Sequence, residues 1–244
     1  GKEAKVSLAA PHTQSNYTLI GESASSPGYG ISYLNTESGR RAEWSIRYAD
    51  GPQTIYYKTQ FLVDNQAKVN DTPPEGEVTQ PSFDGPEEAA SLALIDRATK
   101  RSADNLTFTR ELIKTLNDPD SQNSALILNN MTKVEATHKL LSAAKIHNKV
   151  VGVIELEDGR RRQSIQNMIQ IWDNDQWILF SPESSQQQVQ QNLLIWDESN
   201  VSLLDVVGGQ NSKVHFSMIA QEVSPTEATN SKVSADQLLN LSIH

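Results

Sequence analysis

The sequence predicts an α+β protein in which a small β-rich part precedes helices packed on an antiparallel sheet. Three observations lead to this fold class. Residues 1–63 are rich in Trp, Tyr, Ile and Thr with partial alternation of polarity, a pattern that favours strands. Residues 64–86 hold four prolines in a polar background. Residues 131–183 then follow the order helix, strand, turn, strand, turn, strand.

Within the β-rich part, residues 43–48 and 54–63 are the strongest strand candidates. An Asp-Gly-Pro triplet separates them, which is typical of a tight turn, so we expect a hairpin. Residues 17–20 and 31–34 are shorter candidates, and together these segments predict a small antiparallel sheet or sandwich. Because proline resists both a helix interior and a sheet ladder, residues 64–86 are predicted to be an interdomain linker.

Three helices are predicted after this linker. Pro86 suits the first position of a helix, and the two glutamates behind it complement the positive end of the helix dipole. Further helices are expected over residues 106–116 and 121–128, the former ending at an Asp-Pro pair. The apolar stripe of the first helix consists of Ala90, Ala93, Leu94 and Ala98.

A helix of about fourteen residues beginning at Asn129-Asn130 opens the central segment. Residues 149–156 predict a strand rich in Val and Ile, and an Asp-Gly pair at 158–159 predicts a hairpin turn. Two strands follow, one with alternating isoleucines at 165–171 and one containing Trp177. Strands are also predicted over 203–207 and 214–220, and a polar helix or loose tail over 225–243.

Composition excludes several classes of protein. A net charge of −9 argues against nucleic-acid binding, which needs clustered Lys and Arg on the phosphates. The longest apolar runs, 124–128 and 193–196, are far shorter than the roughly 20 residues of a membrane helix. The chain has no cysteine, so it forms no disulfide and performs no thiol chemistry, and its five histidines lack metal-ligand spacing. We therefore expect neither cofactor nor metal.

Two motifs in the central segment carry a resemblance to a known family. Residues 144–149 read Ala-Lys-Ile-His-Asn-Lys, and residues 177–182 read Trp-Ile-Leu-Phe-Ser-Pro. They resemble the G-I-P-A-R and W-x-x-x-D-P stretches of the transglutaminase-like branch of the papain-type fold. Together with the β-rich first half and the later Asn-Leu-Leu-Ile-Trp-Asp stretch, this is similar to the inactive transglutaminase domain of bacterial membrane proteins.

Active members of that fold carry a Cys, a His and an Asp, because acyl transfer needs a thiolate, an imidazole and a carboxylate that orients the imidazole. Alignment on the two motifs places the Cys position at Asn130, give or take one residue, and the His position near Gln166. Ser181 stands where the Asp is expected. None of these three side chains ionises near neutral pH. The resemblance therefore implies a degenerate transglutaminase-like pseudoenzyme.

The resemblance also implies a context. In that family the domain follows one membrane helix, precedes seven more and lies in the bacterial periplasm. A glutamate ligase-like ATP-grasp protein and a retropepsin-like protease are associated with the family, and a link to osmotic stress or envelope function is suggested. The corresponding division of the chain is a β-rich domain, a linker, an inactive transglutaminase-like domain and a polar tail, over residues 1–63, 64–86, 87–222 and 223–244.

The leading functional hypothesis is a non-catalytic periplasmic domain that binds a peptide or protein ligand, or senses the state of the envelope, for the attached membrane part. A papain-type scaffold holds the main chain of its substrate along a cleft. A member that lacks the nucleophile keeps this cleft and can act as a receptor. One alternative is a structural module that docks a partner protein or a second copy, which an exposed apolar patch would favour. Residual hydrolysis through Ser181 or a displaced His is the least favoured reading. The candidate cleft residues are Asn130, Gln166, Trp177 and Ser181.

Overall fold

A computed structural model describes most of the 244-residue chain, and two compact units are apparent in it. Unit 1 combines residues 1–69, 152–166 and 190–244, and unit 2 combines residues 70–151 and 167–189. The boundaries of these units differ from those of the predicted four-part division. That division describes successive segments of the sequence, and it stays a prediction. The described residues are 2–26, 28–36, 39–49, 52–64, 66–155, 165–187, 193–197, 204–207, 213–223 and 231–242.

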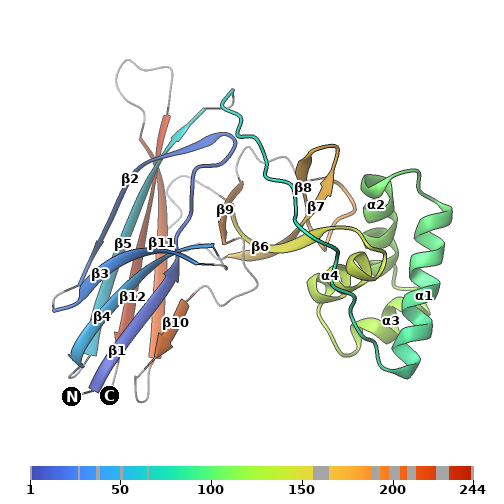
Figure 1. Ribbon diagram of the computed structural model, residues 1–244, viewed down its shortest axis with the longest axis horizontal. Coiled ribbons are helices and arrows are strands. Elements are labelled where there is room, and N and C mark those ends of the chain that lie inside the picture. Colours follow the sequence, from blue (N-terminus) through green and yellow to red (C-terminus); the bar gives the residue numbers. More distant parts are fainter. Residues whose placement is uncertain are drawn as a thin grey trace. The chain divides into compact units, whose positions relative to one another are not determined.

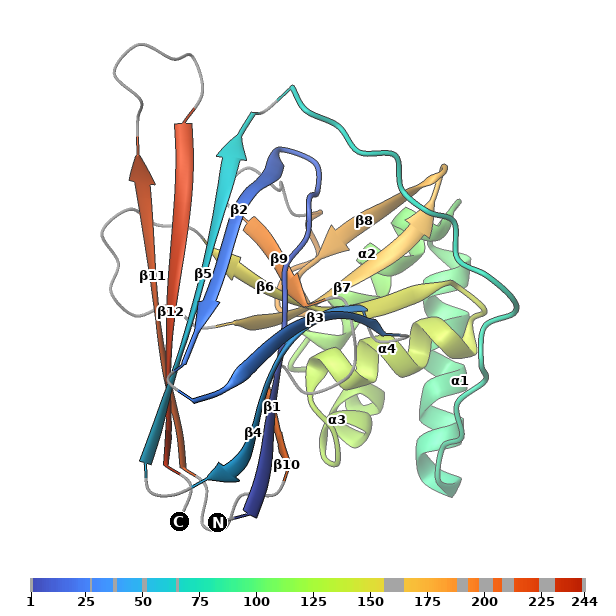
Figure 2. The ribbon, with the colours of Figure 1, turned by 60° about the vertical axis from the view of Figure 1, so that its left-hand side comes forward.

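Two four-stranded sheets make up most of unit 1 (Figures 1 and 2). Their strand orders are β10-β1-β4-β3 and β11-β12-β5-β2, and all their described pairs are antiparallel. The core contains the largest aromatic side chains of this part of the molecule. The strands are β1 (Lys2–Ala9), β2 (Tyr17–Ser25), β3 (Gly30–Thr36), β4 (Gly39–Ala49), β5 (Pro52–Val63), β10 (Leu204–Val207), β11 (Lys213–Val223) and β12 (Ser231–Ser242).

Edge-to-face aromatic contacts run through the core of unit 1. The rings of Trp44 and Tyr57 lie 6.4 Å apart at 82°, and those of Tyr57 and Trp196 lie 6.0 Å apart at 78°. All three residues are at most 1% exposed. Such ring geometry places the positive edge of one ring against the negative face of the next, which adds to the hydrophobic gain of burial. These aromatic residues therefore anchor the core between strands distant in sequence.

The expected hairpin between residues 43–48 and 54–63 is wrong, although both segments are strands. β4 pairs with β1 and β3, whereas β5 pairs with β12 and β2, so the two strands belong to different sheets. A turn motif reverses the chain but does not decide whether the flanking strands share hydrogen bonds. Here the buried aromatic residues of the two strands face one common core, which favours separate sheets. The turn residues 50 and 51 lie outside the described part.

The polar helix or loose tail predicted over 225–243 is also wrong where the structure describes it. Residues 231–242 form β12, which pairs along its whole length with both β5 and β11. Strands at 204–207 and 213–223 confirm two predicted strands, but they pair with β1 and β12 in the sheets of unit 1. A polar strand is hard to recognise from sequence because its pairing partners, and not its own apolar pattern, define it.

A partly buried ionic contact connects the two sheets of unit 1. Glu22 on β2 accepts hydrogen bonds from both terminal nitrogens of Arg40 on β4 and from the hydroxyl of Tyr57 on β5. The hydrogen bond to Glu22 is the main cause that raises the pKa of Arg40. Burial, followed by the bond to Glu22, raises the pKa of Tyr57. Because partnered charges are far less costly to bury than isolated ones, this trio is compatible with the apolar core around it.

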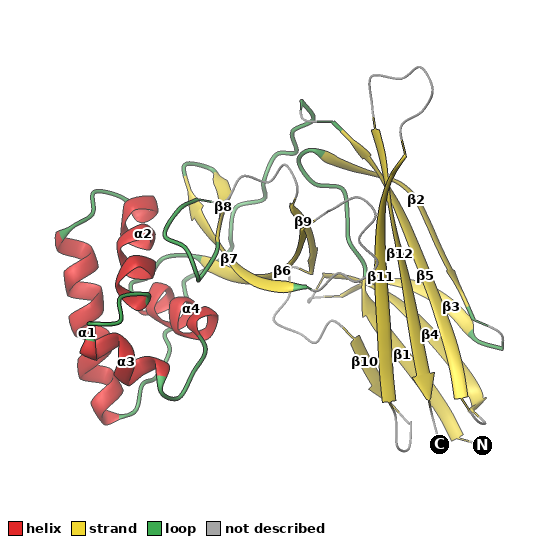
Figure 3. Ribbon diagram, turned by 180° about the vertical axis from the view of Figure 1, so that it is seen from behind, coloured by secondary structure: helices red, strands yellow, loops and turns green. Residues whose placement is uncertain are grey.

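Unit 2 contains four helices, seen together in Figure 3, and part of a third sheet. Their apolar faces pack with β7 and β8 around one core, so the predicted α+β class is confirmed. The third sheet has the order β8-β7-β6-β9, and its described registers are antiparallel. The elements are α1 (Gly85–Lys100), α2 (Asn105–Leu116), α3 (Gln122–Leu128), α4 (Lys133–Ala143), β6 (Asn148–Glu155), β7 (Gln166–Asp173), β8 (Gln176–Phe180) and β9 (Leu193–Asp197).

Local signals explain the helices well. Pro86 lies in the first turn of α1, and Asp104 and Thr132 cap α2 and α4 with reciprocal hydrogen bonds to the first turn. Of the stripe predicted for α1, Ala90, Leu94 and Ala98 are buried, but Ala93 is exposed. The reason is helical geometry, since position 93 falls on the edge of the stripe next to the solvent face.

The β7–β8 hairpin shows a two-residue turn at Asn174 and Asp175. Both residues have positive φ, 49° and 59°, and the flanking Asp173 and Gln176 are paired. Positive φ at both central positions is the geometry whose twist matches that of the strands, and Asn and Asp tolerate it best after Gly. The Asp-Gly pair at 158–159 lies outside the described residues.

Candidate functional site

The start and the end of α4 are both defined by local hydrogen bonds. The Thr132 hydroxyl accepts from the Glu135 amide, and the Glu135 carboxylate accepts from the Thr132 amide. At the other end, the Lys145 amide donates to Ser142 and the Ile146 amide to Leu141, while Lys145 adopts φ 60°. This is a Schellman ending, which satisfies two free carbonyls and turns the chain sharply toward β6.

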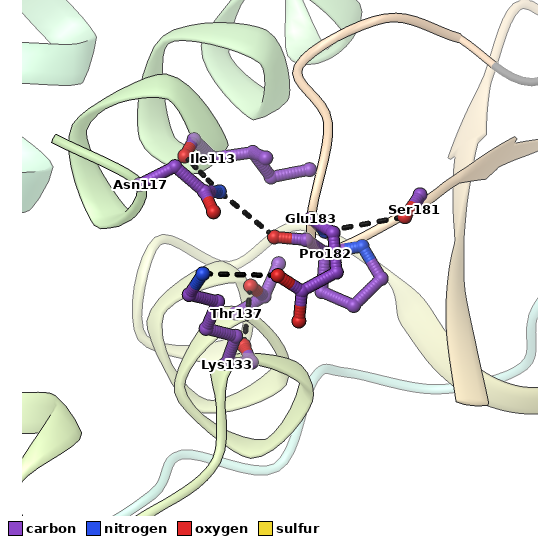
Figure 4. A network of polar contacts seen from close by, with 7 residues as sticks. All are labelled: Ile113, Asn117, Lys133, Thr137, Ser181, Pro182 and Glu183. Atoms are coloured by element: carbon purple, nitrogen blue, oxygen red, sulfur yellow. Dashed lines mark hydrogen bonds and ion pairs between the residues drawn. The ribbon is translucent and has the colours of Figure 1, made fainter. Parts of the chain in front are cut away.

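The segment after β8 is fastened to two helices (Figure 4). The side-chain amide of Asn117, after α2, donates to the Pro182 carbonyl at 2.9 Å. Lys133, the first residue of α4, forms an ion pair of 2.9 Å with Glu183. Ser181 stabilises the same turn, because its hydroxyl accepts from the Glu183 amide at 3.1 Å. The start of α4 and the end of β8 therefore meet.

Asn130 lies in the turn between α3 and α4, exposed, two residues before the cap of α4. Its side-chain amide donates to the buried Glu87 of α1 at 2.9 Å. The loops that contain Asn130 and Ser181 thus both reach the first turn of α4. In each case the side chain is bound to a neighbouring part of the scaffold.

Trp177 is the second residue of β8 and is half-buried. Its main-chain amide donates to Asp71 at 2.8 Å, and its indole N–H donates to the Thr72 carbonyl at 3.1 Å. Ser181 follows Trp177 by four positions of extended chain, a span of about 13 Å. Trp177 therefore holds the Pro-rich segment against the sheet. Gln166 is exposed at the start of β7 and is the last residue of a unit 1 segment, whereas the other three candidates belong to unit 2.

A polar pocket of about 420 Å³ lies between α4 and the Pro-rich segment, at the opposite end of α4 from Lys133. His138 is not among the candidate cleft residues, but it lines this pocket together with Asn148 and Gln80. A signal was present, since His138 and Ser142 are four residues apart and so share one face of α4. The approach of Gln80 to Ser142, at 3.0 Å, was hidden because 62 residues separate them.

Hydrogen bonds in this pocket determine which ring nitrogen of His138 carries the proton. The Asn148 side-chain nitrogen donates to the Ile146 carbonyl at 2.9 Å and to the Ser142 hydroxyl at 3.1 Å. The Asn148 oxygen therefore faces His138, whose Nδ1 lies 2.6 Å away and must carry the proton. In the neutral ring, Nε2 then has a free lone pair. Among the described residues, no group of three His, Asp or Glu side chains is arranged to hold a metal.

Comparison with known proteins gives two likenesses. A candidate cysteine protease of known structure from Cytophaga hutchinsonii is similar over 100% of this chain and 93% of its own, with a TM-score of 0.55 and 11% identity. This likeness concerns the fold, and it confirms the predicted papain-type core. A search of curated proteins finds no match. No described helix is long and apolar enough to cross a membrane.

The family comparison is independent of the motifs at 144–149 and 177–182. The sequence model of inactive transglutaminase fused to seven transmembrane helices matches residues 1–131, more than half of the chain. The matched range covers β1 to β5 and α1 to α3, and so includes the β-rich strands as well as the helices before α4. The chain therefore belongs to the family of inactive transglutaminases that are fused to seven transmembrane helices.

Proposed function

We propose that this chain is a non-catalytic ligand-binding domain, exposed in the bacterial periplasm, of a multi-pass inner-membrane protein. In this proposal it binds a peptide or protein and conveys occupancy, or envelope and osmotic state, to the attached membrane part. The observation that carries the proposal is the use of Asn130 and Ser181. The Asn130 side-chain amide binds Glu87 of α1, the Ser181 hydroxyl stabilises the turn after β8, and neither side chain transfers protons near neutral pH.

The proposed cleft lies around Asn130, Trp177 and Ser181 of unit 2, and Gln166 stays a candidate on the family resemblance alone. Its test is thermal unfolding of the purified domain with peptides and cell-wall fragments. We expect a subset to raise the melting temperature, because a ligand that binds only the folded state stabilises it. Cysteine-directed inhibitors should have no effect. If no peptide or cell-wall fragment shifts the melting temperature at millimolar concentration, the proposal is contradicted.

Paired substitutions locate the cleft. Asn130→Tyr places a bulky ring in the proposed cleft, whereas Asn123→Tyr places the same ring at an exposed position near the start of α3. We expect the ligand-induced shift to be lost only in the first variant. Loss in both, or in neither, would place binding elsewhere. Circular dichroism checks that each variant is folded.

The periplasmic location is proposed on the family context and is tested on the full-length protein. Reporter fusions placed within the domain should be active when the reporter requires the periplasm and silent when it requires the cytoplasm. Association with a glutamate ligase-like ATP-grasp protein and a retropepsin-like protease is part of the same proposal. Co-purification of either protein with the full-length membrane protein would support that association.

A structural docking module is the second candidate, and one observation favours it. β3 is an edge strand with every described residue exposed, and it presents Ile31, Tyr33 and Leu34 at 38–43% exposure. Edge strands with exposed apolar side chains are sites where another chain can pair. Light scattering decides between the candidates: a concentration-dependent dimer that Tyr33→Lys abolishes favours docking.

A further inference from the structure

We infer that the polar pocket between α4 and residues 77–81 binds a small zwitterionic molecule of the amino-acid type. This inference goes beyond the proposed function, since it names a ligand class for a second place in unit 2. The pocket lies entirely within unit 2, and its volume of about 420 Å³ is near the lower end of the roughly 300–1,000 Å³ of small-molecule sites. A single small solute therefore fits it better than a polymer.

The charges that line the pocket have both signs. Glu77 provides a carboxylate from the Pro-rich segment, and Lys139 provides an ammonium group from α4. The Lys139 nitrogen lies 4.6 Å from the centre of the Phe83 ring, a cation–π contact that directs the ammonium toward that segment. A ligand with one charge would meet one attractive and one repulsive group. A ligand with an ammonium and a carboxylate satisfies both.

The neutral groups of the pocket add directionality. Asn148 holds His138 with its proton on Nδ1, so Nε2 is left to accept a hydrogen bond from an ammonium or amide N–H. His147 lines the same pocket, and its main-chain carbonyl is fixed by the Trp172 amide at 3.0 Å. A held acceptor in a pocket that also contains the Glu77 carboxylate is a suitable partner for a ligand ammonium group.

The pocket is also built on rigid supports. Gln80 donates to the Ser142 carbonyl at 3.0 Å, so the Pro-rich segment is tied to α4 at the pocket wall. Asn148 donates to Ser142 and Ile146, both in the Schellman ending of α4. Because Gln80, Asn148 and Lys139 are held before a ligand arrives, little conformational entropy is lost at these side chains on binding.

The test compares three probes of one shape: a free amino acid, its N-acetyl derivative and its amide. The first carries both charges, the second only the negative charge and the third only the positive charge. We expect a panel of free L-amino acids to include a binder that perturbs the NMR signals of Gln80 and Asn148, and each single-charge derivative of that binder to bind at least tenfold more weakly. Equal binding of a single-charge derivative would overturn the zwitterion assignment, and no perturbation by any free amino acid at tens of millimolar would overturn the site.

Charge-removing variants provide the matched controls. Glu77→Gln and Lys139→Met should each weaken binding of the free amino acid about tenfold, whereas Glu75→Gln and Lys145→Met, which alter charges outside the pocket lining, should not. Equal weakening by Glu75→Gln or Lys145→Met would overturn the inference, because it would reflect net charge alone. Long-range nitrogen–proton NMR of His138 should show the proton on Nδ1, and an Nε2 proton would contradict the arrangement.

The two proposals fail in distinguishable ways. A peptide that raises the melting temperature and is blocked by Asn130→Tyr, with no free amino acid perturbing Gln80 or Asn148, would overturn the pocket inference and support the proposed function. A free amino acid that binds the pocket while Asn130→Tyr has no effect on any ligand would support the inference and overturn the proposed cleft. Because the readouts are local, each result points to one of the two sites.

Discussion

The two units differ in how far apart in the sequence their stabilising partners lie. In unit 1, Glu22 joins Arg40 and Tyr57 from other strands, and Gln14 exchanges two hydrogen bonds with Ile195 of β9. In unit 2, the helix caps at Asp104 and Thr132 use residues three positions away. Short-range contacts form early and specify an element by themselves, whereas long-range pairing requires the rest of the sheet. The helices of unit 2 are therefore the locally specified elements of the molecule, whereas the Pro-rich segment and the loop after β8 are held by partners far away in the sequence.

The largest expected effect is in the aromatic core of unit 1. Trp44→Ala should cost about 3–5 kcal/mol, because a fully buried ring is replaced by a cavity. Urea unfolding with segment-resolved hydrogen exchange measures it, and loss of protection should extend across both sheets. Trp44→Phe is the control and should cost much less, since it keeps a ring and removes an indole N–H that has no partner among the described residues. Loss of exchange protection in β4 alone would contradict the view that unit 1 depends on contacts between distant strands.

In unit 2 the equivalent change is Leu140→Ala on the buried face of α4. We expect a loss of about 2–5 kcal/mol, because the side chain is completely buried in the helical core. Hydrogen exchange should rise in α1 to α4 and change little in β1 to β5. The exposed Lys114→Ala on α2 is the control and should leave stability within about 0.5 kcal/mol.

Alkaline pH should weaken unit 1 more than unit 2. Burial raises the pKa of Tyr17 from 10.0 to about 12, so its neutral form is favoured in the folded state. The stability from this group is complete below pH 10 and is lost as the pH rises toward 12, because the unfolded chain deprotonates first. Urea midpoints measured across this range should fall, and Tyr17→Phe should reduce the slope. An unchanged slope would show that Tyr17 titrates normally.

A smaller effect is expected at the cap of α4. Thr132→Ala removes the side chain that accepts from the Glu135 amide and should cost about 1 kcal/mol. Thr132→Ser keeps the hydroxyl and should restore most of the loss. If both variants lose the same amount, the methyl group and not the cap is responsible. Local exchange in the first turn of α4 separates the two cases.

The smallest expected effect is at the ion pair between α4 and the loop after β8. Lys133→Ala should cost less than about 1 kcal/mol, because both side chains are partly exposed and screened by solvent. A double-mutant cycle with Glu183→Gln measures the coupling, which should shrink in high salt. A coupling energy above about 2 kcal/mol would mean that the ion pair is desolvated, and that it joins α4 to the loop after β8 more strongly than the exposure of its side chains suggests.

The sequence alone determined the helices, most strands and the absence of thiol chemistry, because capping residues, apolar periodicity and the lack of cysteine are all local properties. It also pointed to the family, because the short motifs at 144–149 and 177–182 can be recognised together even when each is aligned only approximately. Only the tertiary structure decided that β4 and β5 lie in different sheets and that residues 231–242 form a strand. It also brought Gln80, 62 residues away, to Ser142 beside His138 and Asn148. Strand partners and pocket walls come from segments far apart in the chain, and no local pattern records which of them will meet.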